Sequence, residues 1–166
     1  MDLLDIKDRI AVALVESIFR RAGFVLTPPN SGEMVARLGR EELVPDFWAG
    51  RLPSEAGDPP APARLVEVRY RPQVGQYLAI EEQRGPQSLV VLAKRQWPSL
   101  VFVFVTDHPE AGRSCFQALD LDSWKLGAAV TAVDLSAHHG LGIFRQNVEE
   151  HEALLRRMYA LLTGSR

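Results

Sequence analysis

The most apolar stretch of the chain, LVFVFVT at residues 100–106, constrains the fold most strongly. No charged side chain occurs on either face of the strand that it would form, which is typical of a strand covered on both sides by helices. Residues 87–96 just before it have helical apolar spacing and end near Lys94 and Arg95. A further strand at residues 63–71 precedes that helix. A strand, a helix and a buried strand in this order predict a crossover unit and an α/β sandwich.

The strand expected at residues 63–71, ARLVEVRYR, carries three of its four charges on one face. β-branched and aromatic residues dominate it, and a proline lies at either end. Because alternate side chains of a strand share a face, Glu67, Arg69 and Arg71 point one way. Val66, Val68 and Tyr70 point the other way. An acid and two cations are costly to bury without partners. We therefore expect either a functional site or a ladder of ion pairs on a solvent-exposed face.

The remaining segments continue the α/β pattern. Apolar spacing, glycines and prolines define most of their limits. Residues 72–84 fit a helix or a strand, with a slight preference for helix. The other expected elements are a helix at 5–22 ended by Gly23, a strand at 24–26, a helix at 32–43, a strand at 43–48, an exposed loop at 50–62, a strand at 115–121, a weak strand or extended connection at 128–135 and an amphipathic helix at 147–163.

Length and composition restrict the class of protein. The 166 residues suit one domain, 1–166. The single cysteine, Cys115, excludes an intramolecular disulfide and a cysteine-rich zinc site. No apolar run has the length of a membrane helix, and the first residues lack the apolar stretch of a signal peptide, so we expect a cytoplasmic protein. Phosphate-binding glycine motifs and a nucleophilic GxSxG are absent from the sequence, which argues against nucleotide hydrolases, dinucleotide enzymes and α/β-hydrolases.

A second acid, Asp46, follows Pro45 at the end of an apolar patch upstream of the charged strand. Asp46 and Glu67 on adjacent strands would supply two carboxylates to Mg²⁺ or Mn²⁺, and the Val68 carbonyl a third oxygen. Such a cation polarises a phosphate and lowers the pKa of an attacking water, which suggests phosphodiester chemistry. The alternatives are a turn carboxylate beside a proline for Asp46 and ion pairing along the strand for Glu67 and Arg69.

Pro45-Asp46 followed by Glu67-Val68-Arg69 resembles the signature of the PD-(D/E)XK nuclease superfamily, with arginine in the place of the motif lysine. The resemblance covers roughly residues 5–121. It implies a restriction-endonuclease-like α-β-β-β-α-β core, with a central mixed sheet flanked by helices. The chain adds a C-terminal helix to this core. The resemblance also implies a metal-dependent nuclease that acts on DNA with Mg²⁺ or Mn²⁺.

Arg69 changes what the resemblance implies about catalysis. In the family, the lysine at this position helps to orient or activate the attacking water. A guanidinium binds phosphate well but stays protonated, so it is a poor general base. The alternative is therefore a catalytically inactive nuclease-fold module for binding or assembly. The family's acid on the first helix would correspond to Glu16, whose alternative role is that of a solvated helix residue.

DNA as a partner requires a local basic surface, because the net charge is −2. The candidates for phosphate contacts are Arg71, Arg84, Lys94 and Arg95, and the alternative is a set of scattered surface charges. The apolar stripe of the helix at 147–163 is wide enough for docking onto the core or for pairing with a second copy of the chain. A homodimer through this helix is compatible with either function.

Overall fold

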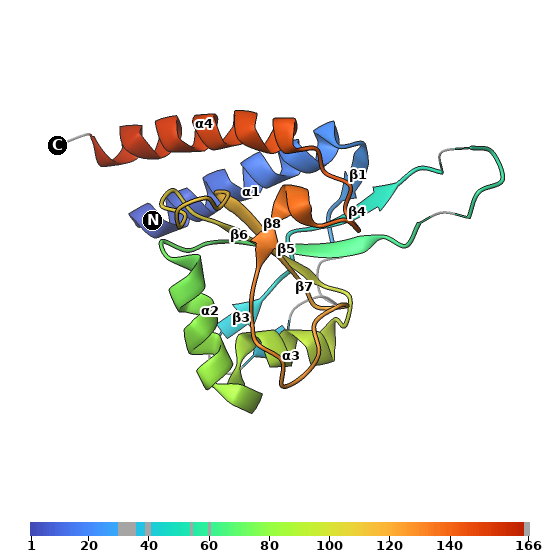
Figure 1. Ribbon diagram of the computed structural model, residues 1–166, viewed down its shortest axis with the longest axis horizontal. Coiled ribbons are helices and arrows are strands. Elements are labelled where there is room, and N and C mark those ends of the chain that lie inside the picture. The colour runs from blue at the N-terminus through green and yellow to red at the C-terminus, as the bar shows by residue number, and fades with distance from the viewer. Residues whose placement is uncertain (30–35, 39–40, 54, 60, 165–166) are drawn as a thin grey trace.

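The chain is organised around a six-stranded mixed sheet in the computed structural model, which describes residues 1–29, 36–38, 41–53, 55–59 and 61–164 (Figure 1). The strand order is β1-β4-β5-β6-β7-β8. β5 and β6 are parallel, and the other neighbouring strands in this sheet are antiparallel. The strands are β1 Phe24–Thr27, β4 Phe47–Arg51, β5 Arg64–Tyr70, β6 Val101–Val105, β7 Phe116–Asp120 and β8 Val133–Asp134.

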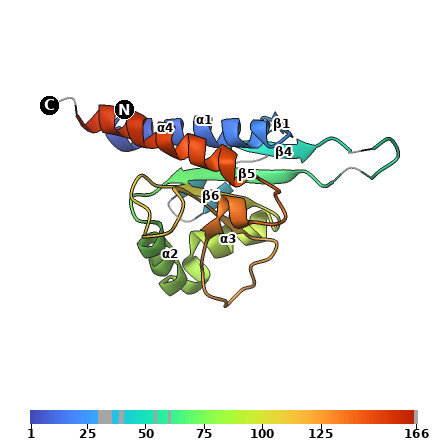
Figure 2. The ribbon, with the colours of Figure 1, turned by 45° about the horizontal axis from the view of Figure 1, so that its top comes forward.

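Helices cover both faces of this sheet, with α1 and α4 on one side and α2 and α3 on the other (Figure 2). The predicted α/β architecture with a mixed sheet and a C-terminal helix is therefore confirmed. Each described helix is too short or too polar to span a membrane. The helices are α1 Leu3–Arg21, α2 Val74–Gln83, α3 Leu89–Gln96 and α4 Arg145–Thr163, with 3₁₀ turns at Gly85–Gln87 and Leu135–Ala137.

β6 lies in the middle of the core, as its sequence predicts. All five residues of VFVFV are buried. Its valines pack in the cluster beneath α1 and α4, whereas Phe102 and Phe104 stack with ring centroids 5.6 Å apart beneath α2 and α3. α2 and α3 connect β5 to β6, and this helical crossover allows the two strands to run parallel.

α1 and α4 pack against each other along the sheet. α1 begins with a capping box between Asp2 and Asp5. It is followed by Gly23 with a φ of 90°, as the sequence predicts for a helix stop. Leu155 and Tyr159 of α4 are buried in the core beside α1. Docking within the chain therefore accounts for much of the apolar stripe of α4.

The helix predicted at residues 32–43 is wrong where the structure describes this segment. β2, Ala36–Leu38, pairs with β3, Glu41–Leu43, in an antiparallel two-stranded sheet. Residues 32–35 and 39–40 of the prediction lie outside the described residues. Leu43 is fully buried in the cluster under α2 and α3. Burial of this leucine outweighs the modest helical spacing of the segment.

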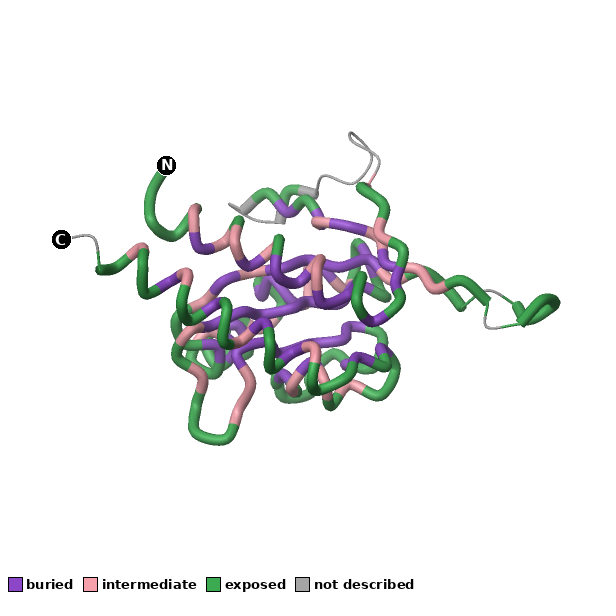
Figure 3. The backbone as a smooth tube through the Cα atoms, turned by 90° about the horizontal axis from the view of Figure 1, so that it is seen from above, coloured by how far each residue is buried: buried purple, intermediate pink, exposed green. Residues whose placement is uncertain are grey.

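β4 begins at Phe47 and continues to Arg51, so it starts and ends later than the strand predicted at 43–48. Pro45 lacks an amide hydrogen, and this suits the position just before the strand. The connection from β4 to β5 projects from the body as an arm whose described residues are exposed (Figures 1 and 3). The weak strand predicted at 128–135 is reduced to the two residues of β8.

Candidate functional site

A cavity of about 590 Å³ opens at the edge of the sheet where β4 begins. α1, the segment before β4, and β5 with the residues after it all contribute to its wall. Five acids and two arginines belong to this wall. The lining residues are Leu4, Asp5, Asp8, Glu42, Val44, Asp46, Glu67, Val68, Arg69, Tyr70, Arg71 and Pro72.

The edge is open because β4 covers only the first part of β5. Their pairing ends at Phe47 and Val66, and the Asp46 amide adds one more bond by donating to the Val66 carbonyl at 2.9 Å. Beyond this point two carboxylates take the place of the missing strand. The Val68 N–H donates to Asp46 Oδ2 at 2.7 Å, and the Tyr70 N–H donates to Asp8 Oδ1 at 2.9 Å. Buried amides require such acceptors, so both acids stabilise the edge of β5.

Glu67 lies beside this edge and is only 7% exposed. Its Oε1 accepts a hydrogen bond from Arg69 Nε at 3.2 Å, whereas its Oε2 is buried and has no hydrogen-bond partner among the described residues. Burial, and then the charge of Asp46, raise the pKa of Glu67 well above its ordinary value. An unsatisfied buried carboxylate oxygen is costly, which favours a proton or a cation at this point.

Asp46 is the close neighbour of Glu67. Burial raises the pKa of Asp46 to about 6, against the opposing effect of the hydrogen bond from the Val68 amide. The two carboxyl groups interact directly, and they can hydrogen-bond to each other when one of them is protonated. The structure thus brings together the two acids that the sequence singled out.

These groups could hold one divalent cation through few protein ligands. The candidates are Asp46, Glu67 Oε2 and the Val68 carbonyl, which faces the same edge as the Val68 amide because both groups of a strand residue point to one side. Within the described ranges, no set of three or more acidic, histidine or cysteine side chains is arranged to hold a metal ion. Two carboxylates with water and substrate oxygens match the way in which Mg²⁺ is commonly bound.

Two arginines supply positive charge to the cavity. Arg69 has a side chain only 12% exposed and is paired with Glu67. The guanidinium of Arg71 lies over the Tyr77 ring, 4.6 Å from its centroid, and donates to the Tyr70 carbonyl at 2.7 Å. Both residues line the cavity, and a guanidinium suits a phosphate oxygen as ligand.

Glu16 does not belong to this site. It forms an ion pair with Arg20 at 3.6 Å and is not among the cavity residues. Glu16 lies about 12 Å further along the α1 axis than Asp8, whereas Asp5 and Asp8 are the acids of α1 that line the cavity. Asp8 has little signal in the sequence, because it stands between Lys7 and Arg9 and resembles a solvated helix residue.

The predicted basic rim is not assembled around the cavity, since only Arg71 of its four members lines it. Arg84 pairs with Glu81 at 3.1 Å. The Lys94 ammonium donates to the carbonyls of Leu121 and Trp124. Arg95 belongs to a separate groove between α3 and the segment after β7.

Lys7 and Tyr70 join α1 to β5 behind the cavity. The Tyr70 hydroxyl donates to Asp107 Oδ1 at 2.7 Å, and Lys7 Nζ donates to both the Tyr70 hydroxyl and Asp107. The Tyr159 hydroxyl donates to the Lys7 carbonyl at 2.6 Å. The hydroxyl of Tyr70 and the charge of Lys7 lower the pKa of Asp107 against the effect of its burial. This network fixes the α1 turn that carries Asp8.

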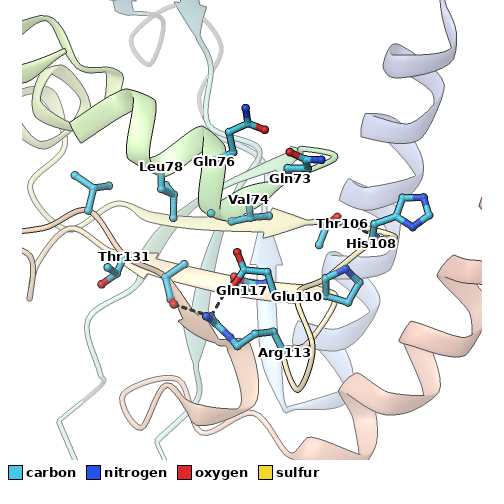
Figure 4. A pocket seen from close by; sticks show the side chains of 14 residues that line it. Gln73, Val74, Gln76, Leu78, Thr106, His108, Glu110, Arg113, Gln117 and Thr131 are labelled. Carbon is cyan, nitrogen blue, oxygen red and sulfur yellow. Dashed lines mark hydrogen bonds between the residues drawn. The ribbon is translucent and has the colours of Figure 1, made fainter. Parts of the chain in front are cut away.

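A second cavity, of about 430 Å³, lies between the start of α2 and the segments on either side of β7 (Figure 4). Arg113 donates inside it to Gln117 Oε1 at 3.1 Å and to the Ala132 carbonyl at 2.7 Å. Thr106 Oγ1 donates to the Pro72 carbonyl and accepts from the His108 amide. These polar groups serve to connect loops, so we place the candidate site at the Asp46–Glu67 cavity.

Comparison of the chain with protein-family models, curated proteins and solved structures finds no match.

Proposed function

We propose that the protein is a nuclease of the PD-(D/E)XK type, which cleaves DNA phosphodiesters with the help of Mg²⁺ or Mn²⁺. The observation that carries the proposal is the meeting of Asp46 and Glu67 at the open edge of β5. Beside them lie two arginines and a Glu67 oxygen that has no hydrogen-bond partner in the part of the chain that the structure describes. The order α1-β1-β4-β5-α2-α3-β6, in which the separate β2-β3 sheet is left out, supports it. It contains the expected α-β-β-β-α-β succession when α2 and α3 are taken together as the crossover between β5 and β6.

Each residue has a defined task in this proposal. Asp46, Glu67 and the Val68 carbonyl would hold the cation, which polarises the phosphate and lowers the pKa of the attacking water. The Val68 amide orients the Asp46 carboxylate by donating to its Oδ2. Arg69 and Arg71 bind the phosphate oxygens and offset the charge that develops there. Arg69 does not accept the proton of the water, since its guanidinium stays protonated.

A second candidate is a catalytically inactive nuclease-fold module that binds DNA. The ion pair between Arg69 and Glu67 favours it, because a guanidinium at 3.2 Å neutralises the acid without a metal. In this case the cavity would bind phosphate through its arginines, and the acids would serve to orient them. Metal dependence therefore distinguishes the two candidates.

The test is cleavage of duplex, nicked, branched and single-stranded DNA with Mg²⁺ or Mn²⁺. We expect the wild type to cleave at least one of these substrates, and Glu67→Ala to abolish cleavage while it keeps the wild-type circular dichroism spectrum. Asp58→Ala, which removes an acid from the exposed arm, is the matched control and retains activity. DNA binding that is unaffected by chelators, with no cleavage of any substrate, would instead support the inactive module.

A further inference from the structure

Arg69 is paired with Glu67, the acid that a cation at this site would need as a ligand. Its Nε donates to Glu67 Oε1 at 3.2 Å, and the side chains of Arg69 and Glu67 are 12% and 9% exposed. An ion pair this well shielded from water is screened much less than one at the surface. A cation that approaches Glu67 therefore meets a positive charge already in place.

The same guanidinium is suited to a phosphodiester. Arginine presents planar N–H donors that match either a carboxylate or a phosphate, so the two anions compete for it. Arg71 is placed differently, since it bonds to the Tyr70 carbonyl and stacks on Tyr77. Of the two arginines that line the cavity, Arg69 is thus the one paired with a proposed cation ligand.

We propose that Arg69 couples cation binding to phosphodiester binding. In the free protein Arg69 holds Glu67 in an ion pair, and a phosphodiester that takes over the guanidinium releases the Glu67 carboxylate to a divalent cation. The inference rests on the proposed function, because it takes Asp46 and Glu67 as the cation ligands. Coupling between two ligands is reciprocal, so the cation strengthens phosphodiester binding by the same factor. The cation site is completed only when substrate is present.

Direct attraction between phosphate and cation would also couple the two ligands, so the test must isolate Arg69. Arg69→Gln removes the charge and keeps a polar side chain, and Arg71→Gln is the matched control that removes a charge from the same cavity. The measurement is a Mn²⁺ titration by isothermal calorimetry on each free protein, without and with dimethyl phosphate as the minimal phosphodiester. Circular dichroism establishes that each variant is folded.

We expect free Arg69→Gln to bind Mn²⁺ at least about tenfold more tightly than the free wild type. The reason is that the variant no longer has to break the charged hydrogen bond between Arg69 and Glu67, whose free energy corresponds to a factor of this size. Dimethyl phosphate should raise the Mn²⁺ affinity of the wild type by a larger factor than that of Arg69→Gln. Equal Mn²⁺ affinity of free wild type and free Arg69→Gln would overturn the coupling and leave the proposed function intact. An equal gain in Arg71→Gln would overturn it as well, because it would show a general effect of charge.

Absence of Mn²⁺ binding in every protein, with and without dimethyl phosphate, would overturn the metal site and the coupling together. Arg69→Lys is the second variant should glutamine prevent folding. Lysine keeps the charge but makes a point contact in place of a planar fork, so the free variant should bind Mn²⁺ more tightly than the wild type by a smaller factor. A free Arg69→Lys protein with wild-type Mn²⁺ affinity would then contradict the coupling.

Discussion

The substitution Asp46→Asn should stabilise the metal-free protein at alkaline pH and leave it nearly unchanged at acidic pH. Asparagine has almost the shape of the protonated aspartic acid, and its carbonyl oxygen can still accept the Val68 N–H that Asp46 accepts at 2.7 Å. The substitution therefore removes the titration of this carboxyl and keeps the bond that covers the edge of β5.

The size of the effect follows from the pKa of Asp46, which burial raises from 3.8 to about 6. A tenfold change in proton affinity corresponds to about 1.4 kcal/mol, so ionising Asp46 inside the fold costs about 3 kcal/mol. The folded state binds the Asp46 proton more tightly than the unfolded state does. In the wild type, protonation of Asp46 therefore contributes fully to the free energy of unfolding below pH 4, and this contribution is lost as the pH rises through 6. Loss of a charged acceptor for the Val68 amide costs the variant about 1 kcal/mol. The net gain at pH 8 is then about 2 kcal/mol.

The assay is guanidinium unfolding followed by circular dichroism between pH 4 and pH 8, with chelator present, and the free energy of unfolding of the variant is compared with that of the wild type at each pH. Acids with a lowered pKa, such as Asp120 at about 2, lose their contribution below this range and cancel in the difference. Asp58→Asn on the exposed arm controls for net charge. A variant-minus-wild-type difference that stays constant from pH 4 to pH 8 would refute the raised pKa of Asp46.

Three further predictions concern the surroundings of the site, and each is checked by guanidinium unfolding. Asp8→Ala leaves the buried Tyr70 amide without its acceptor and should cost about 1–3 kcal/mol, whereas Asp8→Asn should cost less. Lys7→Met breaks a shielded ion pair with Asp107 and should cost about 3–5 kcal/mol, and adding Asp107→Asn should recover part of the loss. Leu155→Ala empties a fully buried position beneath α4 and should cost about 2–5 kcal/mol.

The central strands β5 and β6 could be predicted because the apolar patterns that specify them lie within each strand's own sequence. Residues 100–106 are apolar on both faces, and the structure buries β6 on both faces. Alternation along β5 separates Val66 and Val68 from Glu67, as expected, and places these valines beneath α1. The segment at 36–43 could not be predicted in the same way. Its pairing into β2 and β3 depends on the burial of Leu43 under distant helices, and no local pattern encodes that contact.

The acids of the site show which functional residues a local sequence pattern can identify and which it cannot. Asp46 and Glu67 could be found because a proline-aspartate and a charged strand stand out against apolar neighbours. Asp8 could not, because its role arises only where β4 leaves the amide of Tyr70 uncovered. The early end of the pairing between β4 and β5 also explains why a cavity forms here. A β4 that continued along β5 would satisfy these amides through its own backbone and leave no room for carboxylates. The shortness of β4 thus creates both the need for acidic caps and the cavity at Glu67 and Arg69 that the proposed function assigns to a phosphate.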